Sequence, residues 1–149
     1  MNLNKEYQKQ IQITQWIDEN LRVTLPTDTR SLISIACFGI AIEHRAAICT
    51  LFNSGLFGSM FALLRSVFEN YSRGLFFRYA TTKKEIDLFK KDSFDLEFKD
   101  VIACIEESLD TNNTVLSSFK KTHGKFLIVS LIQIFNMLYV GIQKILLAL

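Results

Sequence analysis

Five ionisable side chains could act together in one central, otherwise largely apolar stretch of the chain: Glu43, His44, Arg65, Glu69 and Arg73. Arginine binds carboxylate and phosphate groups through paired hydrogen bonds. Histidine gains or loses a proton near neutral pH. The five residues therefore form a candidate site for an anionic group, with His44 as its titratable member.

The spacing of these residues suggests how they could meet. Arg65, Glu69 and Arg73 are four residues apart, so on a helix they share one face and can pair in series. The helices on either side of residues 54–58 could form an antiparallel hairpin. Residues at equal distance from the turn would then lie opposite each other on the two helices, and their numbers would sum to about 112. Glu43 and His44 would then join the row from the facing helix.

Two interpretations of this polar row remain open. Charges in apolar surroundings are costly unless they are paired, so these residues, together with Arg45, should meet each other or a ligand. The row could be a buried salt-bridge network that fixes helix register. It could also be a ligand pocket, in which the two arginines bind the anion.

Other chemistry has weaker support. His123 follows Lys120 and Lys121 and precedes Gly124. This basic run could contact phosphate or end a solvated helix. We find no nucleophile, phosphate-loop or dinucleotide motif, and no cluster of Cys and His with metal-ligand spacing. No metal or cofactor is therefore expected, and the three cysteines are interpreted as reduced thiols of a cytoplasmic protein.

The elements that must position these residues are all predicted to be helices. The chain has 149 residues, of which 49% are hydrophobic, and one proline. This composition excludes a disordered chain, and the net charge of +2 does not by itself indicate nucleic acid. Apolar periodicity predicts helices over residues 5–24, 30–53, 57–79, 83–91 and 94–109, with another from about 114. Asp28 or Thr29 can cap the second of these helices, residues 53–55 with Gly55 are a helix end, and Thr82 to Glu85 have the spacing of a capping box.

The pattern predicts an all-α, up-and-down helical bundle of four to six helices. It forms a single domain over residues 1–149, with a core at 30–124, and is built on the long antiparallel hairpin of residues 30–79. The apolar excess favours a homodimer that buries more surface.

The apolar segment 126–149 allows two interpretations. Residues 126–143 are 18 residues without a charge, the lower limit for a membrane span. Ser130, Gln133 and Asn136 recur at roughly helical spacing, as in a helix buried in a bundle. We favour the bundle helix over membrane contact.

Several strings of the chain resemble a family of uncharacterised bacterial all-helical proteins. They are Glu43-His44-Arg45, Gly55 to Ser59, Ala62 to Arg65, Phe68-Glu69, Arg73 to Leu75 and, later, Thr122-His123-Gly124. This family is similar to the HEPN-like and abortive-infection (AbiV-like) helical bundles. The resemblance implies an interaction or regulatory module of a bacterial defence or toxin-like system, with a protein or RNA as partner.

The chain departs from these relatives in two ways. HEPN ribonucleases carry an arginine followed by four to six residues and a histidine, and no such pair exists here. The segment after Gly124 is also more apolar than the family pattern. Two alternatives stay open: a metal-independent ribonuclease with His44 or His123 as candidate catalytic residues, and a small protein anchored in the membrane through residues 126–149.

Overall fold

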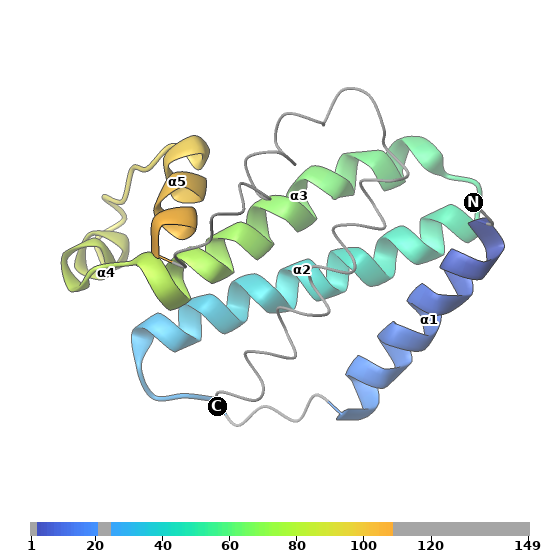
Figure 1. Ribbon diagram of the computed structural model, residues 1–149, viewed down its shortest axis with the longest axis horizontal. Helices are drawn as coiled ribbons and strands as arrows, with labels where there is room; N and C mark the ends of the chain where they lie inside the picture. Colours follow the sequence, from blue (N-terminus) through green and yellow to red (C-terminus); the bar gives the residue numbers. More distant parts are fainter. Residues whose placement is uncertain (1–2, 21–24, 109–149) are drawn as a thin grey trace.

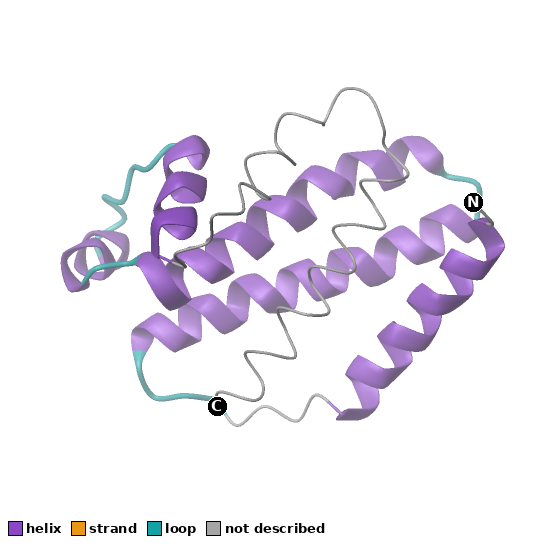
Figure 2. Cartoon of the chain, viewed as in Figure 1, coloured by secondary structure: helices purple, strands orange, loops and turns teal. Residues whose placement is uncertain are grey.

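The computed structural model describes residues 3–20 and 25–108, and those residues are helical with short connections (Figures 1 and 2). The helices are α1 (Leu3–Asn20), α2 (Thr29–Asn53), α3 (Phe57–Leu75), α4 (Lys83–Lys90) and α5 (Phe98–Ser108). A π-helical turn, η1 (Phe76–Ala80), follows α3 directly. No strand occurs in these two ranges. The predicted all-α bundle is confirmed.

The antiparallel hairpin of α2 and α3 is the centre of the fold. Residues 54–56 connect the two helices, and Gly55 adopts φ +70°. The Gly55 N–H donates to the Phe52 carbonyl (3.1 Å) and the Leu56 N–H to the Leu51 carbonyl (2.9 Å). This pair of bonds is the Schellman motif, which ends a helix at a residue with positive φ.

The register of the hairpin agrees with the predicted one. The ring of Phe38 packs against Gly74, and these residue numbers sum to 112. One turn earlier in α2, the Ser34 hydroxyl donates to the Gly74 carbonyl over 2.8 Å. The two helices therefore run side by side along most of their length (Figure 1).

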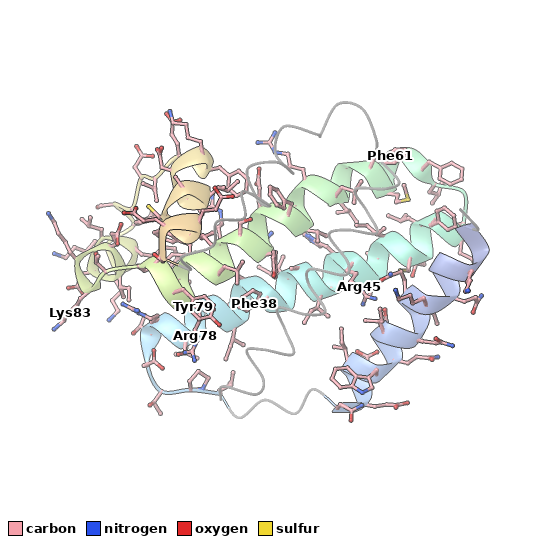
Figure 3. All side chains as sticks on the ribbon, viewed as in Figure 1. Phe38, Arg45, Phe61, Arg78, Tyr79 and Lys83 are labelled. Carbon is pink, nitrogen blue, oxygen red and sulfur yellow. The ribbon has the colours of Figure 1, made fainter. Side chains whose placement is uncertain are left out.

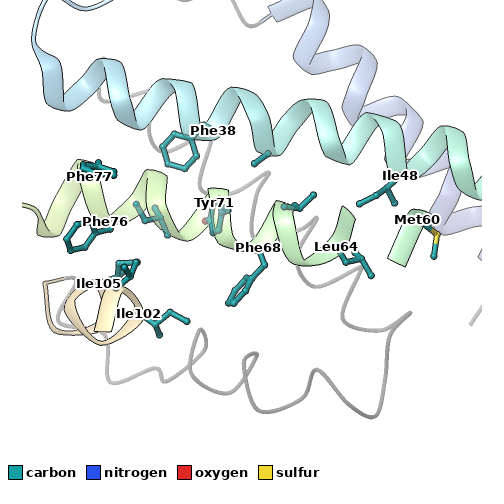
Figure 4. Packing of buried hydrophobic residues seen from close by; sticks show 14 residues of the cluster. Phe38, Ile48, Met60, Leu64, Phe68, Tyr71, Phe76, Phe77, Ile102 and Ile105 are labelled. Carbon is teal, nitrogen blue, oxygen red and sulfur yellow. The ribbon is translucent and has the colours of Figure 1, made fainter. Parts of the chain in front are cut away.

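The core lies between the hairpin and α5 (Figure 4). Ala41, Ile48 and Val67 are at most 2% exposed and fill the α2–α3 contact. Ile102 and Ile105 of α5 are buried just as deeply. Burial of large apolar side chains contributes about 1.5–3 kcal/mol each, so this layer provides most of the stabilisation of the described bundle.

The two ends of the hairpin are covered by different helices (Figure 1). Helix α1 lies beside the end that carries the connection, where the rings of Tyr7 and Phe52 are 5.6 Å apart. Helices α4 and α5 lie at the opposite end. There the rings of η1 and α4 gather around Phe94, which contacts Phe76, Phe77 and Phe89.

Predicted capping signals are confirmed at two helix starts. The Asp28 carboxylate accepts a hydrogen bond from the Ser31 N–H (2.9 Å) at the start of α2. Thr82 and Glu85 form a capping box at the start of α4, with both reciprocal bonds present. These caps satisfy backbone donors that have no partner inside the helix.

Two predicted helices differ from the observed ones. The helix expected over 94–109 begins only at Phe98, because Phe94 packs into the ring cluster from an irregular segment. The helix expected over 57–79 changes at Phe76 into the π turn. There the N–H and the hydroxyl of Thr81 both donate to the Phe76 carbonyl. Residues 109–149 lie outside the described residues. They include the helix expected from about 114, the segment 126–149 and the part of the predicted core beyond residue 108.

Candidate functional site

The predicted polar row of α3 lies on the protein surface. Arg65 Nε and Glu69 Oε1 are 2.6 Å apart, with side-chain exposures of 81% and 28%. Arg73 is also exposed. Arg65, Glu69 and Arg73 each directly follow a buried residue of α3, which turns them about 100° away from the core. The expected pairing of Arg65 with Glu69 is confirmed, and the expected burial of the two arginines is wrong.

The facing helix does not complete this row. Glu43 is exposed and forms no ion pair with any described residue. It follows the buried Ala41 by two residues, so it points about 200° away from the α2 core. His44 is half-buried, and its Nδ1 is buried without a hydrogen-bond partner among the described residues. A role for these residues in ligand binding stays a prediction, and His123 lies outside the described residues.

Arg73 does approach α2 at one point. Burial raises the pKa of the half-buried Cys37 thiol, and the positive charge of Arg73 opposes that rise. Arg73 therefore lies on the same side of the hairpin as Cys37. No ion pair joins Arg73 to α2 among the described residues.

Among the described residues, the buried charged side chain is that of Arg45, which is 1% exposed (Figure 3). Its Nη2 donates to the carbonyl and to the Oε1 of Gln10, both at 2.9 Å, and its Nη1 donates to the Thr14 hydroxyl at 3.0 Å. Burial lowers the pKa of Arg45. These bonds run from α2 to α1, so Arg45 holds α1 against the hairpin.

The sequence contains a signal for this burial. Arg45 follows the core residue Ala41 by four positions and precedes Ile48 by three, which places it on the apolar stripe of α2. Arg45 was predicted to need a charged partner or a ligand, but its hydrogen bonds to α1 were not predicted. The partners come from α1, whose own pattern does not reveal which neighbour it packs against.

A second pair of arginines lies where α2 begins and α3 ends. Arg30 Nη2 donates to the Thr81 carbonyl over 2.5 Å, and Arg78 Nη1 donates to the Ser31 hydroxyl over 3.3 Å. Both arginines are half-buried. Sequence analysis missed this pair because its members are 48 positions apart and come together only through the hairpin.

Metal-ligand chemistry has no candidate in residues 3–20 and 25–108. In these ranges no three or more side chains of the types His, Cys, Asp and Glu lie close enough to hold an ion. Cys37, Cys49 and Cys104 are free thiols.

The chain matches a family of unknown function, DUF6988, over residues 38–133. This match spans more than half of the chain. The chain belongs to the DUF6988 family. The DUF6988 region includes Arg45, the polar row of α3 and Arg78, whereas Arg30 and α1 precede it. No curated protein and no solved structure matches the chain.

Proposed function

We propose that this DUF6988 protein is a HEPN-like interaction or regulatory module of a bacterial defence or toxin-like system, and that it associates with a second copy through α3. The role as a module rests on the sequence resemblance, and association through α3 rests on the exposed Arg65–Glu69 pair. A pair of opposite charges on one helix face is self-complementary under two-fold symmetry. Arg65 of one copy can therefore pair with Glu69 of the other.

The N-terminal half of α3 supports the same surface. Gly58, Ser59 and Ala62 are exposed on this helix ahead of Arg65. Small side chains let a second helix approach closely, and interaxial distances depend on the side chains at the contact. The face thus offers close packing at one end and charge complementarity at the other.

The test measures the mass of the full chain by size-exclusion chromatography with light scattering. The wild type should be a dimer. Arg65→Glu places like charges opposite each other and should produce monomer, and the double variant R65E/E69R restores complementarity and should restore the dimer. The matched control reverses the exposed Glu97–Lys99 pair of α5, which should leave the dimer intact. A wild-type monomer, or a dimer unaffected by R65E, would contradict the proposal.

One observation favours the alternative of a metal-independent ribonuclease. The Nδ1 of His44 has no hydrogen-bond partner among the described residues, and because it is buried it could exchange a proton only with a substrate that reaches this position. Cleavage of single-stranded RNA by the full chain in excess chelator would support this alternative if both H44Q and H123Q reduce it. Intact RNA after long incubation would exclude it.

The alternative of a membrane-anchored protein rests on residues 126–149, and α2 bears on it weakly. Helix α2 is long and apolar enough to cross a membrane by length and composition, and 33% of its most apolar window is buried. Core helices of soluble proteins meet the same criteria. Recovery of the full chain in the membrane fraction after a carbonate wash would favour an anchor, and recovery in the supernatant without detergent would exclude it.

A further inference from the structure

Two arginines belong to segments that are hydrogen-bonded to each other at the end of the hairpin distant from the α2–α3 connection. Arg30 belongs to the first turn of α2, and Arg78 belongs to η1. Each donates to the other's segment, since Arg30 binds the Thr81 carbonyl and Arg78 binds the Ser31 hydroxyl. The two reciprocal bonds hold the guanidinium groups in place on the folded hairpin.

The acceptors of these bonds are neutral, so the two positive charges are not neutralised by them. A guanidinium carries five N–H donors in a fixed plane. The hydrogen bonds to Thr81 and Ser31 use one donor of each arginine among the described residues. The remaining donors can bind an anion, and guanidinium groups suit the several oxygens of a phosphate group.

The neighbouring charges leave an excess of cations. Residues 28–30 and 78–85 carry Arg30, Arg78, Lys83 and Lys84 against two carboxylates, Asp28 and Glu85. Glu85 binds the N–H and the hydroxyl of Thr82 in the capping box. Asp28 caps α2 and is close enough to Arg78 for its pKa to be lowered by that charge, after the larger effect of the Ser31 hydrogen bonds. Asp28 is therefore the group that competes with an anion for Arg78.

An aromatic side chain is available beside these charges. Tyr79 follows Arg78 in the π turn and is 41% exposed, whereas Phe76 and Phe77 of the same turn are buried. Figure 3 shows Arg78 and Tyr79 next to each other at this end of the hairpin. An exposed ring beside a phosphate-binding group is the arrangement that stacks a nucleobase.

We propose that Arg30, Arg78 and Tyr79 form a binding site for a nucleoside phosphate, in which the arginines bind the phosphate and Tyr79 stacks on the base. Lys83 and Lys84 add long-range attraction from the start of α4. The site is separate from the polar row of α3, so it does not depend on the proposed dimer. Arg30, Arg78 and Tyr79 were not among the candidate residues predicted from the sequence.

The test is calorimetric titration of the full chain with adenosine monophosphate, adenosine and pyrophosphate at low salt. Adenosine monophosphate should bind, pyrophosphate should compete with it, and adenosine should bind at least about tenfold more weakly because it lacks the charge-assisted bonds. Arg78→Gln should weaken binding of adenosine monophosphate about tenfold or more. Lys9→Gln, which removes an exposed cation from α1 at the other end of the hairpin, is the control and should leave the affinity unchanged.

Two further variants keep the proposal testable if Arg78→Gln impairs folding. Asp28→Asn retains a capping side chain but removes the competing charge, so it should tighten binding. Tyr79→Ala should weaken binding of adenosine monophosphate but not of pyrophosphate, and Tyr79→Phe should restore the affinity. The proposal is overturned if the wild type binds no adenosine monophosphate, if K9Q weakens binding as much as R78Q, or if only long oligonucleotides bind.

Discussion

The ring of Phe38 occupies the space that the absent side chain of Gly74 leaves between α2 and α3. A Cβ atom at residue 74 would lie 2.7 Å from Cε1 of Phe38, well inside van der Waals contact. Gly74→Ala should therefore destabilise the protein. Overpacking costs about 1–3 kcal/mol, and the helix propensity of alanine offsets up to about 1 kcal/mol. Equilibrium unfolding in urea measures the difference.

A control for this prediction is available in α2. Gly39 has no atom within 4 Å of the position a Cβ would take. Gly39→Ala should therefore stabilise the helix by about 0.5–1 kcal/mol. Combining Gly74→Ala with Phe38→Leu should recover part of the loss, because the shorter side chain makes room. Equal effects of the two glycine substitutions would show that the contact with Phe38 is unimportant.

Replacement of Arg45 should loosen α1 from the hairpin. Arg45→Met leaves the Gln10 side-chain oxygen and the Thr14 hydroxyl without the donor that now binds them. Buried polar groups without partners cost about 1–3 kcal/mol. Hydrogen exchange followed by mass spectrometry should show faster exchange in residues 5–18 than in α3. Lys99→Met, at an exposed position of α5, should change stability by less than about 0.5 kcal/mol, and a similar loss there would contradict the prediction.

Two buried serines should respond in opposite ways to removal of the hydroxyl. Ser34 donates to the Gly74 carbonyl over 2.8 Å, so Ser34→Ala should cost about 1 kcal/mol. Ser72 is fully buried, and its Oγ has no hydrogen-bond partner among the described residues. Ser72→Ala should leave stability unchanged or raise it, because a desolvated hydroxyl is lost. Thermal melts of both variants test this, and equal losses would count against it.

The pH dependence of stability should include a contribution from Asp28. Its hydrogen bonds with Ser31 lower its pKa below the ordinary 3.8. A lowered pKa in the folded state stabilises the protein above pH 3.8, and this contribution is lost as the pH falls through the folded-state pKa. Asp28→Asn should therefore have a lower Tm than the wild type at pH 6, with the difference shrinking below pH 4. A difference that is constant from pH 6 to pH 3 would contradict this origin.

The parts of the fold that follow from local signals were predictable. Gly55 as a helix end, Asp28 and Thr82 as caps, and the antiparallel register were all read from the sequence, because each depends on residues close in the chain. The Phe38–Gly74 contact follows directly from that register. Phe94 was misplaced in a helix because its preference for the ring cluster is set by Phe76 and Phe77, which only the fold brings near.

The candidate site was harder to predict for a physical reason. A spacing of four residues places Arg65, Glu69 and Arg73 on one face, but it does not say whether that face meets the core or water. The buried face of α3 is formed instead by the residues that directly precede these three, which are Leu64, Phe68 and Ser72. Arg45 and the Arg30–Arg78 pair depend on contacts between segments more than 30 positions apart, which helical periodicity does not encode.

The position of α1 has a consequence during synthesis. Helix α1 leaves the ribosome before α2, and its partners Arg45 and Phe52 follow only after the whole connection to α2 and most of α2 have been made. At ordinary translation rates this interval is roughly 2–6 s. The polar residues Gln10 and Thr14 on its packing face keep the waiting helix less prone to aggregate than an all-apolar face would be. The side chains that receive Arg45 in the folded protein are therefore polar groups of the nascent helix before Arg45 exists.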